Sequence, residues 1–115
     1  MEALYQYLVH DLFRRLLSGD KIVMNRIAEF RGEVKLRGGD LIFTLPELFS
    51  FALLNFAHDR PTADKIDPND YLEFRQALYD HPTNTMLKHY GGIVEVEFVH
   101  ENQLLTVYRL TRIEQ

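Results

Sequence analysis

The chain contains no cysteine among its 115 residues. This absence excludes disulfides, thiolate nucleophiles and zinc sites with cysteine ligands. It also means that folding needs no oxidising compartment. Serine is nearly as scarce, because Ser18 and Ser50 are the only two. Ser18 lies at the end of a predicted helix and Ser50 lies within a strongly apolar stretch, so neither has the surroundings of an activated nucleophile.

Long hydrophobic runs, a basic leader and a linker are also missing. No apolar run approaches the roughly 20 residues that a membrane-spanning helix needs. The chain begins Met1-Glu2, with an acidic residue in place of the basic start of a signal peptide. No low-complexity segment divides it. We therefore expect one cytoplasmic domain over residues 1–115, with no membrane partner.

The residues that are present can build a core. Hydrophobic residues make up 46% of the chain, including eight Phe and six Tyr, which suffices for one compact domain and argues against disorder. The net charge is −4, and an acidic chain is not typical of a dedicated nucleic-acid binder.

The first half of the chain shows two helix patterns and one hairpin pattern. Leucine recurs every four residues from Leu4 to Leu16, which predicts a helix over residues 3–17 that ends at Ser18-Gly19. Asp20 can cap a second helix that runs to about Phe30 or Arg31. In residues 33–44, Gly38-Gly39 predicts a two-residue turn that places Arg37 opposite Asp40 and Val34 opposite Phe43.

The second half repeats the order of helices and hairpin. Thr44 to Glu47 has the pattern of a capping box before an apolar helix at 45–58, and an all-round apolar helix is either central or covered by a partner. A further helix is predicted from Asp67 to about Tyr79, with Leu72 in its apolar stripe, and one or two helical turns over 83–90. Strands at 93–99 and 104–113 with a turn at Glu101-Asn102 place Val96 opposite Val107.

The predicted fold is therefore an α+β domain with the order helix-helix-hairpin-helix-helix-hairpin. The two hairpins could remain separate or join into one antiparallel sheet with the helices packed on one face. We predict the joined sheet.

Charge is distributed unevenly along this order. Residues 14–37 hold seven basic and three acidic residues, a net of +4, whereas the remainder holds six basic and fourteen acidic ones, a net of −8. A helix followed directly by a basic hairpin resembles the recognition helix and wing of winged-helix proteins, although only two helices precede this hairpin. Arg26, Arg31 and Lys35 are accordingly the candidate residues for an anionic partner. A solvated face, with Arg37 paired to Asp40, is the alternative interpretation.

The five histidines indicate no particular chemistry. Two of them are followed by an aspartate, His10-Asp11 and His58-Asp59, but no pair has the helical spacing of a zinc protease motif. We expect surface or loop-end histidines, no catalytic residues, and no metal or other cofactor. A small hydrolase built from histidines and carboxylates is the third functional alternative.

Three features favour a non-catalytic protein-binding module of the adaptor, inhibitor or immunity type. They are the apolar helix at 45–58, the strand edges of the hairpins, and the acidic alternation Glu95–Glu97 followed by Glu101. Such surfaces bind basic partners or a second copy in a homodimer. The second alternative is a nucleic-acid-binding regulator that uses residues 14–37.

Overall fold

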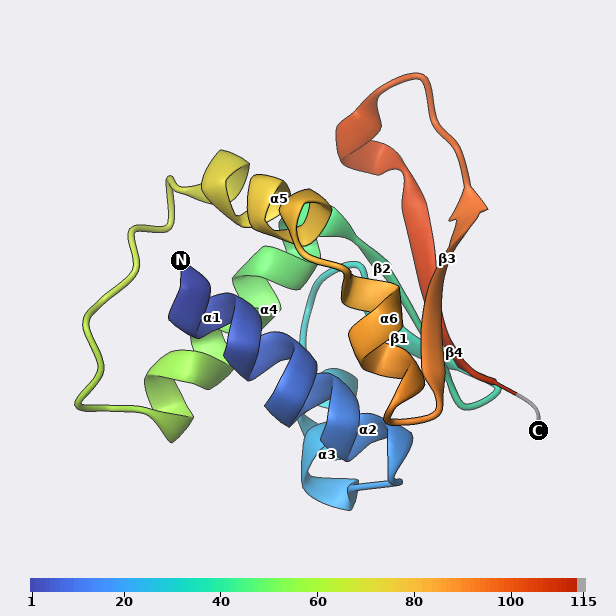
Figure 1. Ribbon diagram of the computed structural model, residues 1–115, viewed down its shortest axis with the longest axis horizontal. Coiled ribbons are helices and arrows are strands. Elements are labelled where there is room, and N and C mark those ends of the chain that lie inside the picture. The colour runs from blue at the N-terminus through green and yellow to red at the C-terminus, as the bar shows by residue number, and fades with distance from the viewer. Residues whose placement is uncertain (114–115) are drawn as a thin grey trace.

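Two helices and a tight hairpin form the first half of the chain in the computed structural model, which describes residues 1–113 (Figure 1). The first helix begins as α1 (Glu2–Tyr7), continues through a π-helical segment (Leu8–Phe13) and ends as α2 (Arg14–Leu17). After Gly19 the chain enters α3 (Lys21–Glu29), and the strands β1 (Val34–Arg37) and β2 (Asp40–Thr44) follow. The Asp20 carboxylate caps α3 as predicted, because it accepts from the backbone N–H groups of Ile22 and Val23.

The second half has the same order of elements. The helices are α4 (Leu45–Asp59), α5 (Tyr71–Asp80) and α6 (Thr83–Lys88). They are followed by β3 (Gly92–Phe98), a 3₁₀ turn (Gln103–Leu105) and β4 (Val107–Arg112). The predicted α+β fold is thus confirmed. The helix expected to start at Asp67 starts later, at Tyr71, after a turn formed by residues 67–70.

The two hairpins join into one four-stranded antiparallel sheet, in the order β1-β2-β4-β3. The joining pair is β2 with β4, in which Leu41 lies opposite Leu110 and Phe43 opposite Tyr108. The helices lie together on one side of this sheet (Figure 1). The strands β1 and β3 are therefore its two edges.

The first hairpin has the predicted register, with Val34 opposite Phe43 and Arg37 opposite Asp40. Gly38 and Gly39 both have positive φ angles, +59° and +88°. Such angles suit the twist of a two-residue hairpin turn and are strained for residues with a Cβ.

The second hairpin differs from the prediction. Val96 lies opposite Tyr108, not Val107, and a bulge between Val96 and Phe98 shifts the register by one residue within the hairpin. The connection is also longer than a turn at Glu101-Asn102, since the strands end at Phe98 and resume at Val107.

The apolar helix α4 is the central helix of the domain. It packs against α1, α5 and the first hairpin, and its residues Leu48, Ala52 and Phe56 are buried. This location accounts for its apolar composition without a partner. The predicted capping box is not formed, because the Thr44 side chain makes no hydrogen bond to the first turn of α4. On α5, Phe74 is fully buried, but Leu72 points outward and is 64% exposed, contrary to its predicted place in the apolar stripe.

No helix within residues 1–113 is both long enough and apolar enough to cross a membrane.

Two substitutions at Gly38 test the turn. A Cβ at this position would meet nothing within 4 Å, so different substitutions there should differ in stability only through backbone strain. We expect Gly38→Val to lower the free energy of unfolding by about 1–2 kcal/mol, because β-branched residues disfavour the left-handed region. Asn tolerates that region, so Gly38→Asn is expected to stay close to wild type in urea unfolding. Equal losses for both variants would contradict this explanation.

Candidate functional site

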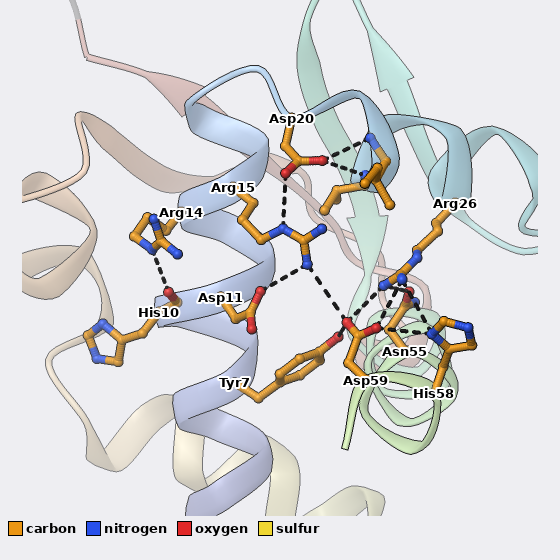
Figure 2. Close-up of polar contacts among 12 residues, drawn as sticks. Tyr7, His10, Asp11, Arg14, Arg15, Asp20, Arg26, Asn55, His58 and Asp59 are labelled. Atoms are coloured by element: carbon orange, nitrogen blue, oxygen red, sulfur yellow. Dashed lines mark hydrogen bonds and ion pairs between the residues drawn. The ribbon is translucent and has the colours of Figure 1, made fainter. Parts of the chain in front are cut away.

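The three basic residues predicted to bind an anion do not form one set of free cations. Arg26 on α3 points at Asp59 at the end of α4 and donates two hydrogen bonds to its carboxylate, of 2.8 and 2.9 Å (Figure 2). It also donates to the side-chain oxygen of Asn55 at 3.1 Å. The guanidinium group is therefore neutralised within the protein.

Asp59 is the centre of a polar cluster that joins three helices. The Tyr7 hydroxyl donates to it at 2.5 Å, and Arg15 lies 3.7 Å from the same carboxylate oxygen. Arg15 in turn pairs with Asp11 and Asp20, each at 3.1 Å. Figure 2 shows these side chains converging from α1–α2, α3 and α4. The cluster connects elements that are more than 30 residues apart in sequence.

The cluster changes the ionisation of its members. Hydrogen bonds from Arg26 hold the pKa of Asp59 well below its usual range, although partial burial opposes this effect. Burial raises the pKa of Tyr7, and its hydrogen bond to Asp59 raises that pKa further. These shifts accompany an internal ion-pair network in which each charged group has a partner.

The other predicted basic residues are dispersed. Lys35 on β1 lies 3.7 Å from Glu33, and both side chains are largely exposed. Arg31 follows α3, is exposed, and makes no ion pair within residues 1–113. Arg37 does not pair with Asp40 as predicted but lies 3.6 Å from Glu97, while Asp40 accepts from Thr111 instead.

Four of the five histidines contact separate partners. Nδ1 of His10 lies 2.6 Å from the Tyr90 hydroxyl, and His58 lies 3.0 Å from Asp59. His81 stacks on Tyr5 and lies 2.9 Å from Glu2, whereas His100 accepts a backbone hydrogen bond in the connection between β3 and β4. Within residues 1–113, no three His, Asp or Glu residues are grouped so that they could hold a metal ion.

A groove with a mostly apolar lining lies between the helices and the second hairpin. Its volume is about 310 Å³. We call it the hairpin groove. One wall comes from α5 and α6, the other from β3 and β4, and the floor from the core; its lining residues are Phe13, Phe43, Leu45, Leu48, Leu78, Tyr79, His81, Thr83, Asn84, Val94, Glu95, Val96 and Tyr108.

Tyrosines give the hairpin groove an amphipathic rim. Tyr79 on α5 is 64% exposed, and the half-buried ring of Tyr108 on β4 stacks on Phe43 with 5.9 Å between ring centroids. Burial raises the pKa of Tyr108 to about 12, and its interaction with the Tyr79 hydroxyl contributes to the rise. The Tyr108 hydroxyl is therefore neutral at pH 7. Tyrosine is enriched in protein interfaces because its ring buries apolar area while its hydroxyl can bond.

Exposed apolar side chains continue along the second hairpin. On β3, Val96 and Phe98 are each more than half exposed. In the connection that follows, Val99 is 74% exposed, and Leu104 and Leu105 are also exposed. Isolated exposed apolar residues are common, but several on one hairpin next to an apolar groove indicate a contact surface.

The sequence indicated part of this site. The sequence pattern indicated the strand edges of the hairpins and the alternating glutamates Glu95 and Glu97 as features of a binding surface. It missed Tyr79, Asn84 and Tyr108, because their roles depend on α5, α6 and β4 meeting in space. The regular alternation from Ile93 to Phe98 was the only sequence signal for the site.

Comparisons of this chain with models of protein families, with curated proteins and with solved structures find no match.

The Asp59 cluster can be tested by removing its central charge. We expect Asp59→Asn to lower the free energy of unfolding at pH 7 by about 2 kcal/mol, because Arg26 loses a charged acceptor. A carboxyl with a lowered pKa in the folded state stabilises the protein above its unfolded pKa of about 3.9 and loses that contribution as the pH falls. The gap between wild type and variant should therefore be constant from pH 7 to about 4 and shrink below that, as measured by urea unfolding.

Asp64→Asn is the matched control, since Asp64 is exposed and makes no ion pair or side-chain hydrogen bond within residues 1–113. It should change stability by less than about 0.5 kcal/mol. A similar loss in both variants would show that Asp59 does not hold the helices together.

Proposed function

We propose that this chain is a non-catalytic protein-binding module that docks its partner in the hairpin groove. The observation that carries the proposal is the open apolar groove bordered by Tyr79 and by the exposed edge strand β3. Protein-binding sites commonly centre on aromatic anchors in a partly formed pocket with a polar rim.

The charges around the groove favour a partner with basic side chains. Glu95 is the only acidic residue that lines the groove, and it makes no ion pair within residues 1–113. Glu101, in the connection next to β3, is exposed and also has no ion-pair partner in that range. The chain as a whole has a net charge of −4. An acidic rim speeds encounter with a basic partner and selects against acidic ones.

The nucleic-acid alternative has weaker support. It needs Arg26, Arg31 and Lys35 to face the phosphates of one ligand. Arg26 is held by Asp59 and Asn55, and Lys35 lies beside Glu33, so phosphate binding would have to compete with these contacts.

Site-specific photocross-linking in cells tests the proposal. A photoreactive phenylalanine analogue replaces Tyr79, which lines the groove, or Leu72, which lies on the same helix with the same exposed fraction of 64% but outside the groove. We expect a distinct protein adduct from position 79 and none from position 72, with the adduct identified by mass spectrometry.

The opposite results are equally informative. The same adducts from both positions, or no protein adduct from position 79, would contradict a partner in the groove. An adduct removed by nuclease would instead favour the nucleic-acid alternative.

A further inference from the structure

The edge strand β3 is closed at its start and open at its end. Asn84 on α6 binds the backbone of Val94 twice: its Nδ2 donates to the Val94 carbonyl at 3.0 Å, and its Oδ1 accepts from the Val94 N–H at 2.8 Å. The Asn84 amide thus donates one hydrogen bond and accepts one, as the backbone of a neighbouring strand would do at this position. Edge strands present such unpaired groups unless something covers them.

The same edge is uncovered two residues later. The Val94 N–H and carbonyl point away from β4, since they bind Asn84. Successive residues of a strand alternate in direction, so the N–H and carbonyl of Val96 point to the same open side. Val96 lies before the bulge, and its side chain lines the hairpin groove. An unpaired strand edge and an apolar groove therefore lie side by side.

Glu95 indicates which charge a ligand at this edge should carry. It borders the groove between Val94 and Val96, but successive side chains of a strand alternate between faces, so its carboxylate lies at the rim on the other face of the sheet. Its nearest cross-strand neighbour, Arg109, binds Glu97 at 3.0 Å and lies 3.7 Å from Asp40, so Arg109 is already neutralised. The exposed Glu95 carboxylate remains available to a cation on a strand added beside β3.

A second copy of the chain fits this edge poorly. If two β3 strands paired with both Val96 side chains on the groove side, Glu95 would face Glu97 in the antiparallel case or Glu95 in the parallel case. Like charges directly opposite each other across two strands are destabilising. The homodimer expected as one option from the sequence is therefore not favoured at this edge.

This inference rests on the proposed function and specifies its ligand. We propose that the partner supplies an extended segment, with apolar side chains alternating with Lys or Arg, that adds as a strand to β3 beyond Asn84. Its main chain would bond to Val96, its apolar side chains would enter the hairpin groove beside Tyr79, and a basic side chain would pair with Glu95. Strand addition of this kind obtains affinity from main-chain bonds and specificity from alternate side chains.

Selection from a displayed library of random nine-residue peptides tests the inference on the full chain. Wild type, Glu95→Lys and Glu73→Lys serve as targets. The last is a control with the same charge change at an exposed residue of α5 that makes no ion pair within residues 1–113 and does not line the groove. We expect wild type and Glu73→Lys to select peptides that alternate apolar and basic residues. Their affinity for Glu95→Lys should be at least about tenfold lower, a change typical of a reversed charge contact.

N-methylation of the best peptide, one residue at a time, tests the strand geometry. Val96 is the residue before the bulge whose backbone faces the open side, so binding should be lost when the peptide residue opposite Val96 is methylated and retained when either of its neighbours is methylated. Light scattering on the chain alone should give the monomer mass.

Four results would overturn the inference: no enriched peptide, enriched peptides without the alternation, a methylation scan in which no position is sensitive or neighbouring positions are equally sensitive, or a dimer that Glu95→Lys dissociates or strengthens. The cross-linking experiment is independent of these. A protein adduct at position 79 without an alternating peptide would retain the proposed function and remove only the strand-addition inference.

Discussion

The pairing of β2 with β4 is the interaction on which the architecture depends. It joins the two halves of the chain, with Leu41 opposite Leu110 and Phe43 opposite Tyr108. The pairing turns two hairpins, each too small to be stable alone, into one sheet that the helices cover on one face. It also determines that β3 is an edge and that Tyr108 borders the groove opposite α5. The candidate site therefore exists because the two hairpins meet through β2 and β4 and not through β1 or β3.

The parts of the fold that local sequence could predict are those that local interactions specify. Gly38-Gly39 determined the first turn and with it the whole register of β1 and β2. The second hairpin has no comparable signal, because a bulge after Val96 and a connection from Phe98 to Val107 leave several pairings open. The bonds from Asn84 to Val94 have no signal in the sequence at all, since a side-chain amide binds a strand only after α6 has packed against β3.

The basic segment shows why net charge along a sequence is a poor guide to a surface. Residues 14–37 have a net charge of +4, but Arg15 and Arg26 are occupied by Asp11, Asp20 and Asp59. Asp59 lies 33 residues after Arg26, outside the segment of residues 14–37. The folded protein uses these arginines to join helices through charge-assisted hydrogen bonds. In contrast, Glu95 belongs to the acidic alternation that is visible in the sequence, and within residues 1–113 it has no ion-pair partner.

The two hydrogen bonds from the Asn84 side chain to the backbone of Val94 have a kinetic consequence. Because β3 ends at Phe98, only Glu95–Phe98 lies beyond the residue that Asn84 holds. A strand added to so short a stretch can form few main-chain bonds, so the contacts of its side chains must provide most of the affinity. Differences in affinity between related complexes arise mainly from dissociation rates. A strand added at this edge, as we propose, would therefore be held by few bonds and would exchange rapidly.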